Sequence, residues 1–477
     1  MKVRFNELVV VESDPFANCK LDRKRYAKVL TKIVESYADG FVLAINNRWG
    51  TGKTTFVKMW KCDLHNNGFK TFYFNAWEND FDTEPLPALI AELRDTIGSD
   101  KTTFENLLSK AASVSKIILP SIAKHITSKY IGDEASDIIF DSTEAATEVL
   151  KDEVEHYLKK KKGIKAFKED LDLLVKKVDS KKPFVFIIDE LDRCRPDYAV
   201  EILEKVKHFF SIPGIVFVLS IDKKQLGYAI QGYYGSAMID TDEYLRRFID
   251  LEYSLPEPSY EAYSSHLFDI LNFSEFFSQS ISTGNDTYHS DIKNITLFFG
   301  KNFNYTLRQL EKLYTHTRIV IRAFSSLYNI KLSVIVFLVH LKLFQSEVYD
   351  KLKRAELSMQ EFIDKIESMF IFNSEDQFYH KLVFIIADIS LLYNYYFNEI
   401  KCMYDGRNNM LLMRNENEKD EYEFFVTSKT DIYYSNKSII SFKEAVEYCI
   451  KKDYQYIETN LGFYLNKVDI LENLKSE

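Results

Sequence analysis

Cysteine is scarce in this sequence, with five residues in a chain of 477. Cys19, Cys62, Cys194, Cys402 and Cys449 lie too far apart to indicate a disulfide framework or the closely spaced pairs of a zinc site. The nine histidines show no metal-ligand spacing either, with one another or with cysteine. The composition therefore argues against a small disulfide-stabilised domain and against a zinc-binding module.

Long hydrophobic runs are missing as well. A helix that crosses a bilayer needs about 20 mostly apolar residues. Residues 114–126 are interrupted by lysines, a histidine and a proline, and residues 332–344, which contain His340 and Lys342, are too few. We expect the second segment to be a buried helix. The N-terminal residues have no apolar signal core, which argues against export.

Length and charge add to these expectations. The chain carries 62 basic and 71 acidic residues, for a net charge of −9, and 46% of its residues are hydrophobic, which is enough for large cores. A chain of 477 residues sets a prior of about three domains. We therefore expect a soluble, cytoplasmic protein with no membrane span.

The sequence does contain a glycine-bearing loop between an apolar run, 41–45, and a helix-like segment. Backbone N–H groups of such a loop converge on a phosphate, and the next helix directs its positive dipole end towards it. Lys53 is placed to reach the β and γ oxygens, and Thr54 is placed to hold Mg²⁺. We therefore predict a nucleoside triphosphate site formed by these loop residues: Asn47, Arg48, Trp49, Gly50, Thr51, Gly52, Lys53, Thr54 and Thr55.

Asn47 departs from the general pattern of such loops, whose first glycine is due at this position. Asparagine is the residue other than glycine that best tolerates a left-handed backbone. We therefore expect the turn to survive the replacement.

A second apolar run, 184–188, ends in a cluster of carboxylates, and it is uniform enough to be a strand covered by helices on both faces. Ligand chemistry in such folds lies at the carboxyl ends of the strands, so we expect Asp189 beside Mg²⁺ and Glu190 beside an attacking water. Further buried strands are expected at 71–77 and 214–222, and Asp222 is the expected sensor of the γ-phosphate or the water. The predicted fold class is α/β, with a parallel sheet flanked by helices.

Four segments, 48–54, 74–77, 188–194 and 244–249, resemble in content and order the KAP family of P-loop NTPases. The likeness covers roughly residues 14–345, and the Asp189–Glu190 pair resembles the NTPase class with an additional strand and a catalytic glutamate. The family resemblance implies a P-loop core over 1–255 with a helical insertion at about 84–180, and a helical lid over 256–345. Many members carry transmembrane helices in that insertion, and this chain is expected to lack them. Residues 346–477 are expected to be mainly helical, as a partner-binding region or a small helical core.

A cation at the transferring phosphate often completes such sites, in cis or from a neighbouring subunit. We expect Arg246, Arg247 or Arg308 in this role, with Arg193 and Arg195 as competitors, and the resemblance makes Arg308 a γ-phosphate sensor on the lid. For each arginine a salt bridge is the structural alternative. The basic run 159–162 suggests nucleic-acid contact, but a solvated helical face is the favoured interpretation.

Two functions remain open. The first is a Mg²⁺-dependent ATPase whose cycle drives conformational change or assembly, with self-association or protein partners. The second is a nucleotide-gated interaction module with little or no hydrolysis. The Asp189–Glu190 pair favours the ATPase, which we prefer, and Asn47 favours the module. ATP is the default nucleotide because no guanine-specificity motif is evident, and the resemblance adds an association with bacterial defence against phage or plasmids.

Overall fold

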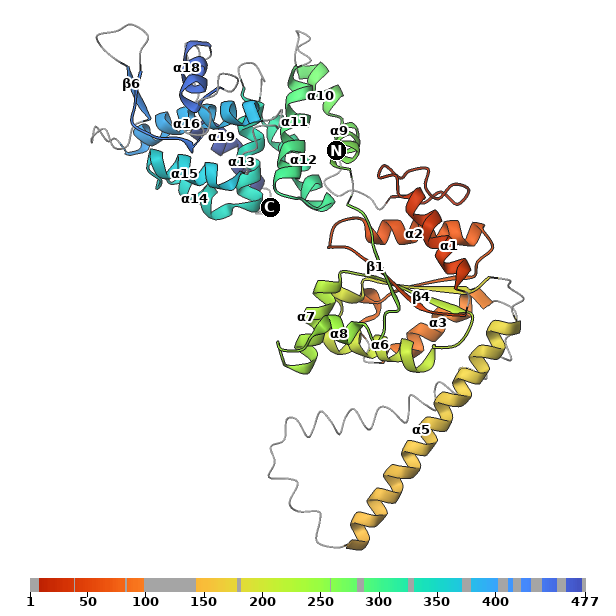
Figure 1. Cartoon of the computed structure of the whole chain (residues 1–477). Helices are drawn as coiled ribbons and strands as arrows, with labels where there is room; N and C mark the ends of the chain where they lie inside the picture. Colours follow the sequence, from red (N-terminus) through yellow and green to blue (C-terminus); the bar gives the residue numbers. More distant parts are fainter. Residues whose placement is uncertain are drawn as a thin grey trace. The chain divides into compact units, whose positions relative to one another are not determined.

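The computed structural model describes residues 8–37, 39–81, 84–97, 143–177, 182–257, 259–280, 287–324, 330–370, 379–401, 411–414, 422–429, 440–452 and 460–473. The chain divides into two compact units after Glu257 (Figure 1). We call the described residues up to Glu257 the N-terminal unit and those from 259 onward the C-terminal unit. The apolar segment 114–126 lies outside the described residues.

Parallel strands form the sheet of the N-terminal unit, and their order in space is β2-β3-β4-β1-β5. Strand β4 lies between β1, which leads into the glycine-bearing loop, and β3, which ends at Asp189. This order confirms the α/β class with a strand added between those two. The strands are β1 (Val42–Asn46), β2 (Thr71–Asn75), β3 (Phe184–Asp189), β4 (Ile215–Ile221) and β5 (Leu251–Ser254).

Strands β3 and β4 are buried on both faces along their whole length, which explains why nearly all of their residues are apolar. Successive side chains of a strand point to opposite faces. Phe184, Phe186 and Ile188 of β3 thus join one core, whereas Val185 and Ile187 join the other.

Helices cover the two faces in separate groups (Figure 1). Helices α1 (Lys24–Ser36) and α2 (Lys53–Asn66) cover one face. The other face is covered by α3 (Pro85–Ile97), α5 (Thr143–Lys177), α6 (Pro196–Phe209), α7 (Lys223–Tyr234) and α8 (Thr241–Leu245). Two short 3₁₀ turns, η1 (Trp77–Asn79) and η3 (Leu191–Arg193), follow β2 and β3.

Helix α5 belongs to the predicted helical insertion, together with α3. Its C-terminal part joins the core through Phe167, Leu171 and Leu174. The basic run 159–162 lies nearer the N-terminus of the same helix, where Lys159 is exposed and pairs with Glu155 at 3.3 Å. This placement favours the interpretation of the run as a solvated helical face.

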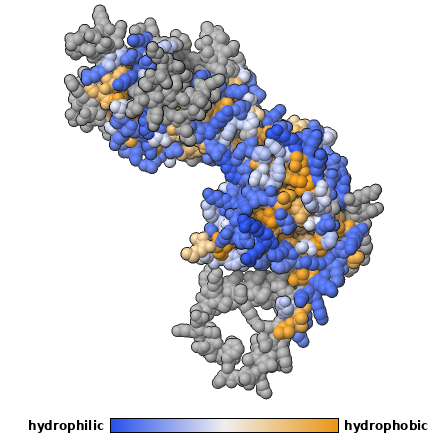
Figure 2. All heavy atoms as spheres, in the orientation of Figure 1, coloured by the Kyte–Doolittle hydropathy of each residue, from blue (hydrophilic) through white to orange (hydrophobic). Residues whose placement is uncertain are grey.

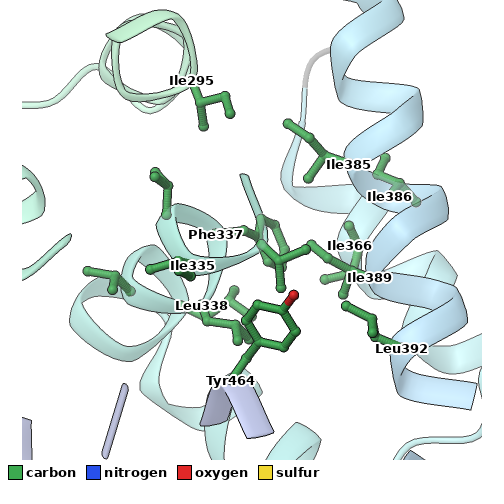
Figure 3. Packing of buried hydrophobic residues seen from close by; sticks show 14 of the residues in the cluster. Ile295, Ile335, Phe337, Leu338, Ile366, Ile385, Ile386, Ile389, Leu392 and Tyr464 are labelled. Carbon is green, nitrogen blue, oxygen red and sulfur yellow. The ribbon is translucent and has the colours of Figure 1, made fainter. Parts of the chain in front are cut away.

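The C-terminal unit is mainly helical, as expected, and one hydrophobic core extends through it from Leu267 to Val468. Helix α13 contributes Ile335, Phe337 and Leu338 to this core, and Figure 3 shows them opposite residues of α16. The sequence did not predict its two antiparallel strands, β6 (Leu412–Arg414) and β7 (Tyr422–Phe424). Its helices are α9 (Tyr260–Ile270), α10 (Phe273–Ser280), α11 (Thr287–Asn302), α12 (Leu307–Arg322), α13 (Leu332–Phe344), α14 (Ser346–Lys353), α15 (Met359–Met369), α16 (Tyr379–Lys401), α18 (Phe442–Lys452) and α19 (Leu461–Asn473).

Helix α13 is the apolar segment that the sequence predicts to be a buried helix, and its residues from Val334 to Leu341 are all buried. Within the described residues, no single helix is long and apolar enough to cross a bilayer. Among the described helices, α13 and α14 meet the requirements of length and apolar composition only when taken together, and they are bent by 120° at their junction. Hydrophilic residues cover most of the described surface on the face drawn in Figure 2.

Candidate functional site

The carboxyl ends of neighbouring strands bring the predicted site residues to one edge of the sheet. Asn75 of β2 is in register with Asp189 of β3, and Asp189 is in register with Ser220 of β4. Asn46, the last residue of β1, is in register with Ile221 of β4. We call the glycine-bearing loop that follows β1 the phosphate loop. Because the strands are parallel, this loop and the segments that begin at residues 190 and 222 all leave the sheet at this edge.

Gly50 and Gly52 give the phosphate loop its shape, with φ values of 76° and 83° in the left-handed region. Asn47 does not share this conformation, so the loop does not depend on the tolerance of asparagine for a left-handed backbone. In the part of the chain that the structure describes, the residues other than glycine with positive φ are Asp22, Glu190, Asn272, Asn304 and Ala355. The reason for asparagine at position 47 must therefore lie in its side chain.

Lys53 begins helix α2, and its side chain turns back onto the loop that precedes it. The Nζ atom donates to the carbonyl oxygens of Asn47 and Arg48, at 2.6 and 3.1 Å. Burial lowers the pKa of Lys53, and nearby carboxylates, Asp192 first, act against that shift. Both hydrogen-bond acceptors of this cation are neutral carbonyls, and a phosphate oxygen would be a stronger acceptor than either.

Trp49 is held at the loop by two carboxylates. Its backbone N–H donates to Asp222 Oδ2 at 3.1 Å, and its indole Nε1 donates to Asp192. Asp222 also caps helix α7 by accepting from the backbone N–H of Gln225, and burial raises the pKa of Asp192. A phosphate that takes the Trp49 amide therefore has to displace the Asp222 carboxylate.

Asp189 is almost fully buried, with 1% of its surface exposed. Its oxygens accept from the hydroxyl of Tyr73 at 2.9 Å and from the backbone N–H of Glu190 at 3.0 Å. Both donors are neutral, and burial together with the nearby Asp189 charge raises the pKa of Tyr73. A buried carboxylate with neutral partners fits a site for a bound cation.

The oxygens available near Asp189 suit Mg²⁺, which prefers hard oxygen ligands and is usually held by one or two carboxylates together with substrate phosphates. Thr54, in the first turn of α2, offers a hydroxyl, and Asp189 offers a carboxylate. Among the residues that the structure describes, no group of three His, Cys, Asp or Glu side chains is arranged to hold a metal ion. The remaining ligands of a Mg²⁺ ion here would thus be phosphate oxygens and water.

Glu190 has its backbone in the left-handed region, with φ of 60°, and its carboxylate is held by three donors. These are Arg193 Nη1 at 2.9 Å, Asn75 Nδ2 at 3.3 Å and the Thr54 hydroxyl at 3.4 Å. Burial raises the pKa of Glu190, and Arg193 acts against this. Arg193 in turn lies over the exposed indole of Trp77, with its guanidinium carbon 5.4 Å from the ring centroid. The structure thus places the predicted catalytic carboxylate in contact with the predicted Mg²⁺ ligand Thr54.

Asn75 and Arg23 are contact residues of the site to which the sequence analysis gave no role. Asn75 could have been found by the signal that marked Asp189, since it is a polar residue at the end of a buried strand. Arg23 has no such signal. It is 2% exposed, its Nη2 donates to the carbonyl of Thr51 at 3.1 Å, and its Nη1 has no hydrogen-bond partner.

The three arginines predicted to complete the site are all exposed. Arg246 and Arg247 are exposed beside α8, and Arg246 pairs with Glu243 at 2.7 Å. Within the described residues, neither forms a hydrogen bond or ion pair with a predicted site residue. Arg308 is exposed in the first turn of α12, in the C-terminal unit. Arg193 is thus the arginine in contact with Glu190, and the roles of the other three stay predictions.

The sequence matches the family model described as the KAP family P-loop domain over residues 23–328, more than half of the chain. Two solved structures of the ORC2 protein of Aeropyrum pernix are also similar. Its ADPNP-ADP complexes share 11% identity with a TM-score of 0.32, and the match covers 83% of this chain and 87% of that chain. Its ADP form shares 12% identity with a TM-score of 0.32, covering 83% and 86%. No curated protein matches the sequence.

Proposed function

We propose that this chain, which belongs to the KAP family of P-loop NTPases, hydrolyses ATP in a Mg²⁺-dependent reaction. The observation that carries the proposal is the contact of Glu190 with Thr54, at 3.4 Å, beside the phosphate loop. A carboxylate in this position can orient a water or take its proton, next to the hydroxyl that would hold the metal ion.

For the residues of the phosphate loop and of the strand ends, the proposed roles follow from their contacts. Lys53 and the loop amides stabilise the charge on the phosphates, Thr54 and Asp189 hold Mg²⁺, and Glu190 orients the attacking water. Mg²⁺ bound there would neutralise charge that develops on the transferred phosphoryl group. Asp222 is the proposed sensor, and Arg246, Arg247 or Arg308 is the proposed cation that completes the site.

Binding of the nucleotide changes several internal contacts. Lys53 donates to two loop carbonyls and has a third N–H for a phosphate oxygen, whereas the single backbone N–H of Trp49 has to leave Asp222. Glu190 accepts from three donors, two on Oε1 and one on Oε2, so its carboxylate can still accept from a water. The Trp49 amide would exchange its carboxylate acceptor for a phosphate oxygen, so this donor keeps a hydrogen-bond partner.

Phosphate release from the purified chain with Mg²⁺ and ATP or GTP tests this proposal. Glu190→Gln should lower turnover by about 10²- to 10⁴-fold, the usual contribution of a general base, and should retain bound ATP. Glu78→Gln is the matched control, because Glu78 is exposed on the turn after β2 and does not contact Glu190. Turnover of Glu190→Gln at the wild-type level would contradict the role of Glu190. Turnover per chain that rises with protein concentration would indicate a site completed by self-association.

A nucleotide-gated interaction module is the second candidate, and one contact favours it. The side-chain amide of Asn47 donates to the carbonyl of Leu255, four residues before the described part of the C-terminal unit begins at residue 259. ATP binding without turnover in the same assay would select this candidate. A role in bacterial defence against phage or plasmids, with protein partners, belongs to the proposal through the resemblance alone.

A further inference from the structure

The segment that leaves the N-terminal unit runs next to the phosphate loop. Strand β5 ends at Ser254, and Glu257 is the last residue of the unit. We call residues 255–257 the connector. Leu255 is 3% exposed and packs in the core under α1 and α2, and its N–H donates to the carbonyl of Asn46 at 3.0 Å. The connector is therefore anchored to the end of β1, where the phosphate loop begins.

Two loop side chains reach the connector directly. Asn47 Nδ2 donates to the carbonyl oxygen of Leu255 at 2.7 Å, and Arg48 Nε lies 3.5 Å from the carboxylate of Glu257. Asn47 Oδ1 also accepts from the backbone N–H of Arg48 at 2.7 Å. The amide of Asn47 thus links the loop backbone and the connector through a single planar group.

The same two residues hold Lys53. The carbonyls of Asn47 and Arg48 are the acceptors of the Lys53 Nζ, at 2.6 and 3.1 Å. A bound triphosphate competes with these carbonyls for the three N–H donors of Lys53, because charge-assisted hydrogen bonds to phosphate are stronger than those to neutral carbonyls. Occupancy of the site therefore changes the contacts of the two residues that touch the connector.

A glycine at position 47 would serve the backbone equally well. The φ of Asn47 is not positive, so the backbone there does not depend on the choice between asparagine and glycine for its conformation. Glycine would make neither side-chain hydrogen bond. What asparagine adds at this position is the link to Leu255 and to the Arg48 amide.

We propose that Asn47 is a positioning residue that carries occupancy of the phosphate loop by a nucleoside triphosphate to the connector, the segment with which the N-terminal unit ends. This inference rests on the proposed nucleotide binding but not on hydrolysis. Phosphates would restrict the conformation of the loop through several charge-assisted hydrogen bonds. The hydrogen bond from Asn47 to the carbonyl of Leu255 would then restrict the conformation of the connector. Coupling of this kind is reciprocal, so weakening the connector also changes the affinity for the nucleotide.

Hydrogen exchange of the connector tests the proposal in the full-length chain, with and without Mg²⁺ and a non-hydrolysable ATP analogue. All proteins are compared at a saturating concentration of the analogue, as established by calorimetry, so that differences in affinity do not enter. In the wild type the analogue should slow exchange in peptides that cover residues 251–257 by about twofold to tenfold, the effect of one hydrogen bond. In Asn47→Gly this slowing should be lost, whereas the analogue should still slow exchange in the loop.

Asn67→Gly is the matched control, because Asn67 is exposed at the end of α2 and bonds only to the preceding helix, at Asp63 O. It should show the wild-type slowing. Glu257→Gln, which weakens the second contact, should reduce the slowing in part and should also change the affinity for the analogue. The same slowing in Asn47→Gly as in the wild type would overturn the proposal.

Loss of analogue binding in Asn47→Gly would overturn it too, because Asn47 would then serve phosphate binding itself. A wild-type chain that binds no analogue would instead overturn the proposed function. Binding with no change at the connector would leave the proposed function intact and would remove the coupling.

Discussion

The two units bury charged groups in different ways. In the N-terminal unit, Lys53, Asp189 and Asp222 are all buried and gather at one edge of the sheet. In the C-terminal unit, each buried charge has a different local partner: Asp388 pairs with the half-buried Lys331 at 2.7 Å, Arg318 donates to the carbonyl of Leu271, and Glu367 accepts from Ser428. Parallel strands cause the first arrangement, because every strand end and the loop after it lie at the same edge. Clustering of buried charge, rather than burial of charge alone, therefore marks the unit with the candidate site.

Arginine replacement tests whether the C-terminal unit contributes to that chemistry, and it should give the largest effect. If Arg308 completes the site, Arg308→Ala should lower turnover by about 10³- to 10⁵-fold, the range for arginines that stabilise the transferring phosphoryl group. Arg322→Ala, an exposed arginine in the last turn of the same helix α12, is the control. The measurement is phosphate release at saturating ATP.

Arg246→Ala and Arg247→Ala complete this comparison. A large loss in either, with normal turnover in Arg308→Ala, would place the required cation in the N-terminal unit and leave the C-terminal unit without a catalytic group. Mixing such a variant with Glu190→Gln then asks whether the arginine acts within one chain or across two, because restored turnover requires sites shared between chains.

Core substitutions test whether each unit depends on its own core. Phe186→Ala removes a ring that stacks between Phe72 and Phe217 under the site, at centroid distances of 5.6 and 5.2 Å. It should destabilise the N-terminal unit by about 3–5 kcal/mol and weaken ATP binding. Leu338→Ala, in α13, should cost about 2–5 kcal/mol and leave ATP binding intact. Calorimetric unfolding and ATP titration of both variants check this, and loss of ATP binding in Leu338→Ala would contradict it.

Lys53→Ala acts on the buried cluster itself. It removes the cation expected to meet the β and γ phosphates, so ATP affinity should fall by about tenfold to a hundredfold, since a hydrogen bond to a charged group contributes about 1.5–3 kcal/mol. Lys61→Ala, on the same helix α2, should bind ATP normally. Calorimetric titration gives both affinities, and unchanged binding in Lys53→Ala would refute the assignment of the phosphate loop.

Sequence patterns predicted the features of this molecule that depend on residues close to one another in the chain. The uniform apolar run that ends at Asp189 indicated a strand buried on both faces, and the glycines at 50 and 52 indicated the loop, because each pattern has a direct physical cause. Helix α12 lies in the segment that the resemblance predicted to be a helical lid, and Arg308 is exposed on it.

Contacts between distant segments were not predictable in this way. The link from Asn47 to Leu255 joins residues 208 positions apart, and the bond from Asn75 to Glu190 joins residues 115 apart. Such pairs depend on which strands are neighbours, and no local spacing encodes that. For this reason the sequence analysis considered only the backbone of Asn47, whereas the contact with Leu255 is made by its side chain.

The smallest effect that we expect is a dependence of the stability of the C-terminal unit on pH. His340 is buried among aromatic rings in the C-terminal unit, with its Nδ1 bonded to the hydroxyl of Tyr305, and burial lowers its pKa from 6.5 to about 3. Between these values the unfolded state binds the proton and the folded state does not, so stability falls as the pH is lowered through this window. The slope is at most about 1.4 kcal/mol per pH unit, and stability above pH 6.5 should not depend on this group.

Hydrogen exchange of α13 between pH 5 and 8, corrected for the intrinsic pH dependence of exchange, measures this slope. The buried carboxyl groups of Glu311 and Glu367, whose pKa is raised by burial, act in the opposite direction. His340→Phe removes the titrating group and should flatten the profile below pH 6.5, at a constant cost of about 1–3 kcal/mol for the unpaired Tyr305 hydroxyl. An unchanged slope in this variant would show that another group titrates. A flat profile in α13 of the wild type would mean that a buried basic group, even in the unit without clustered charge, can be protonated without loss of stability.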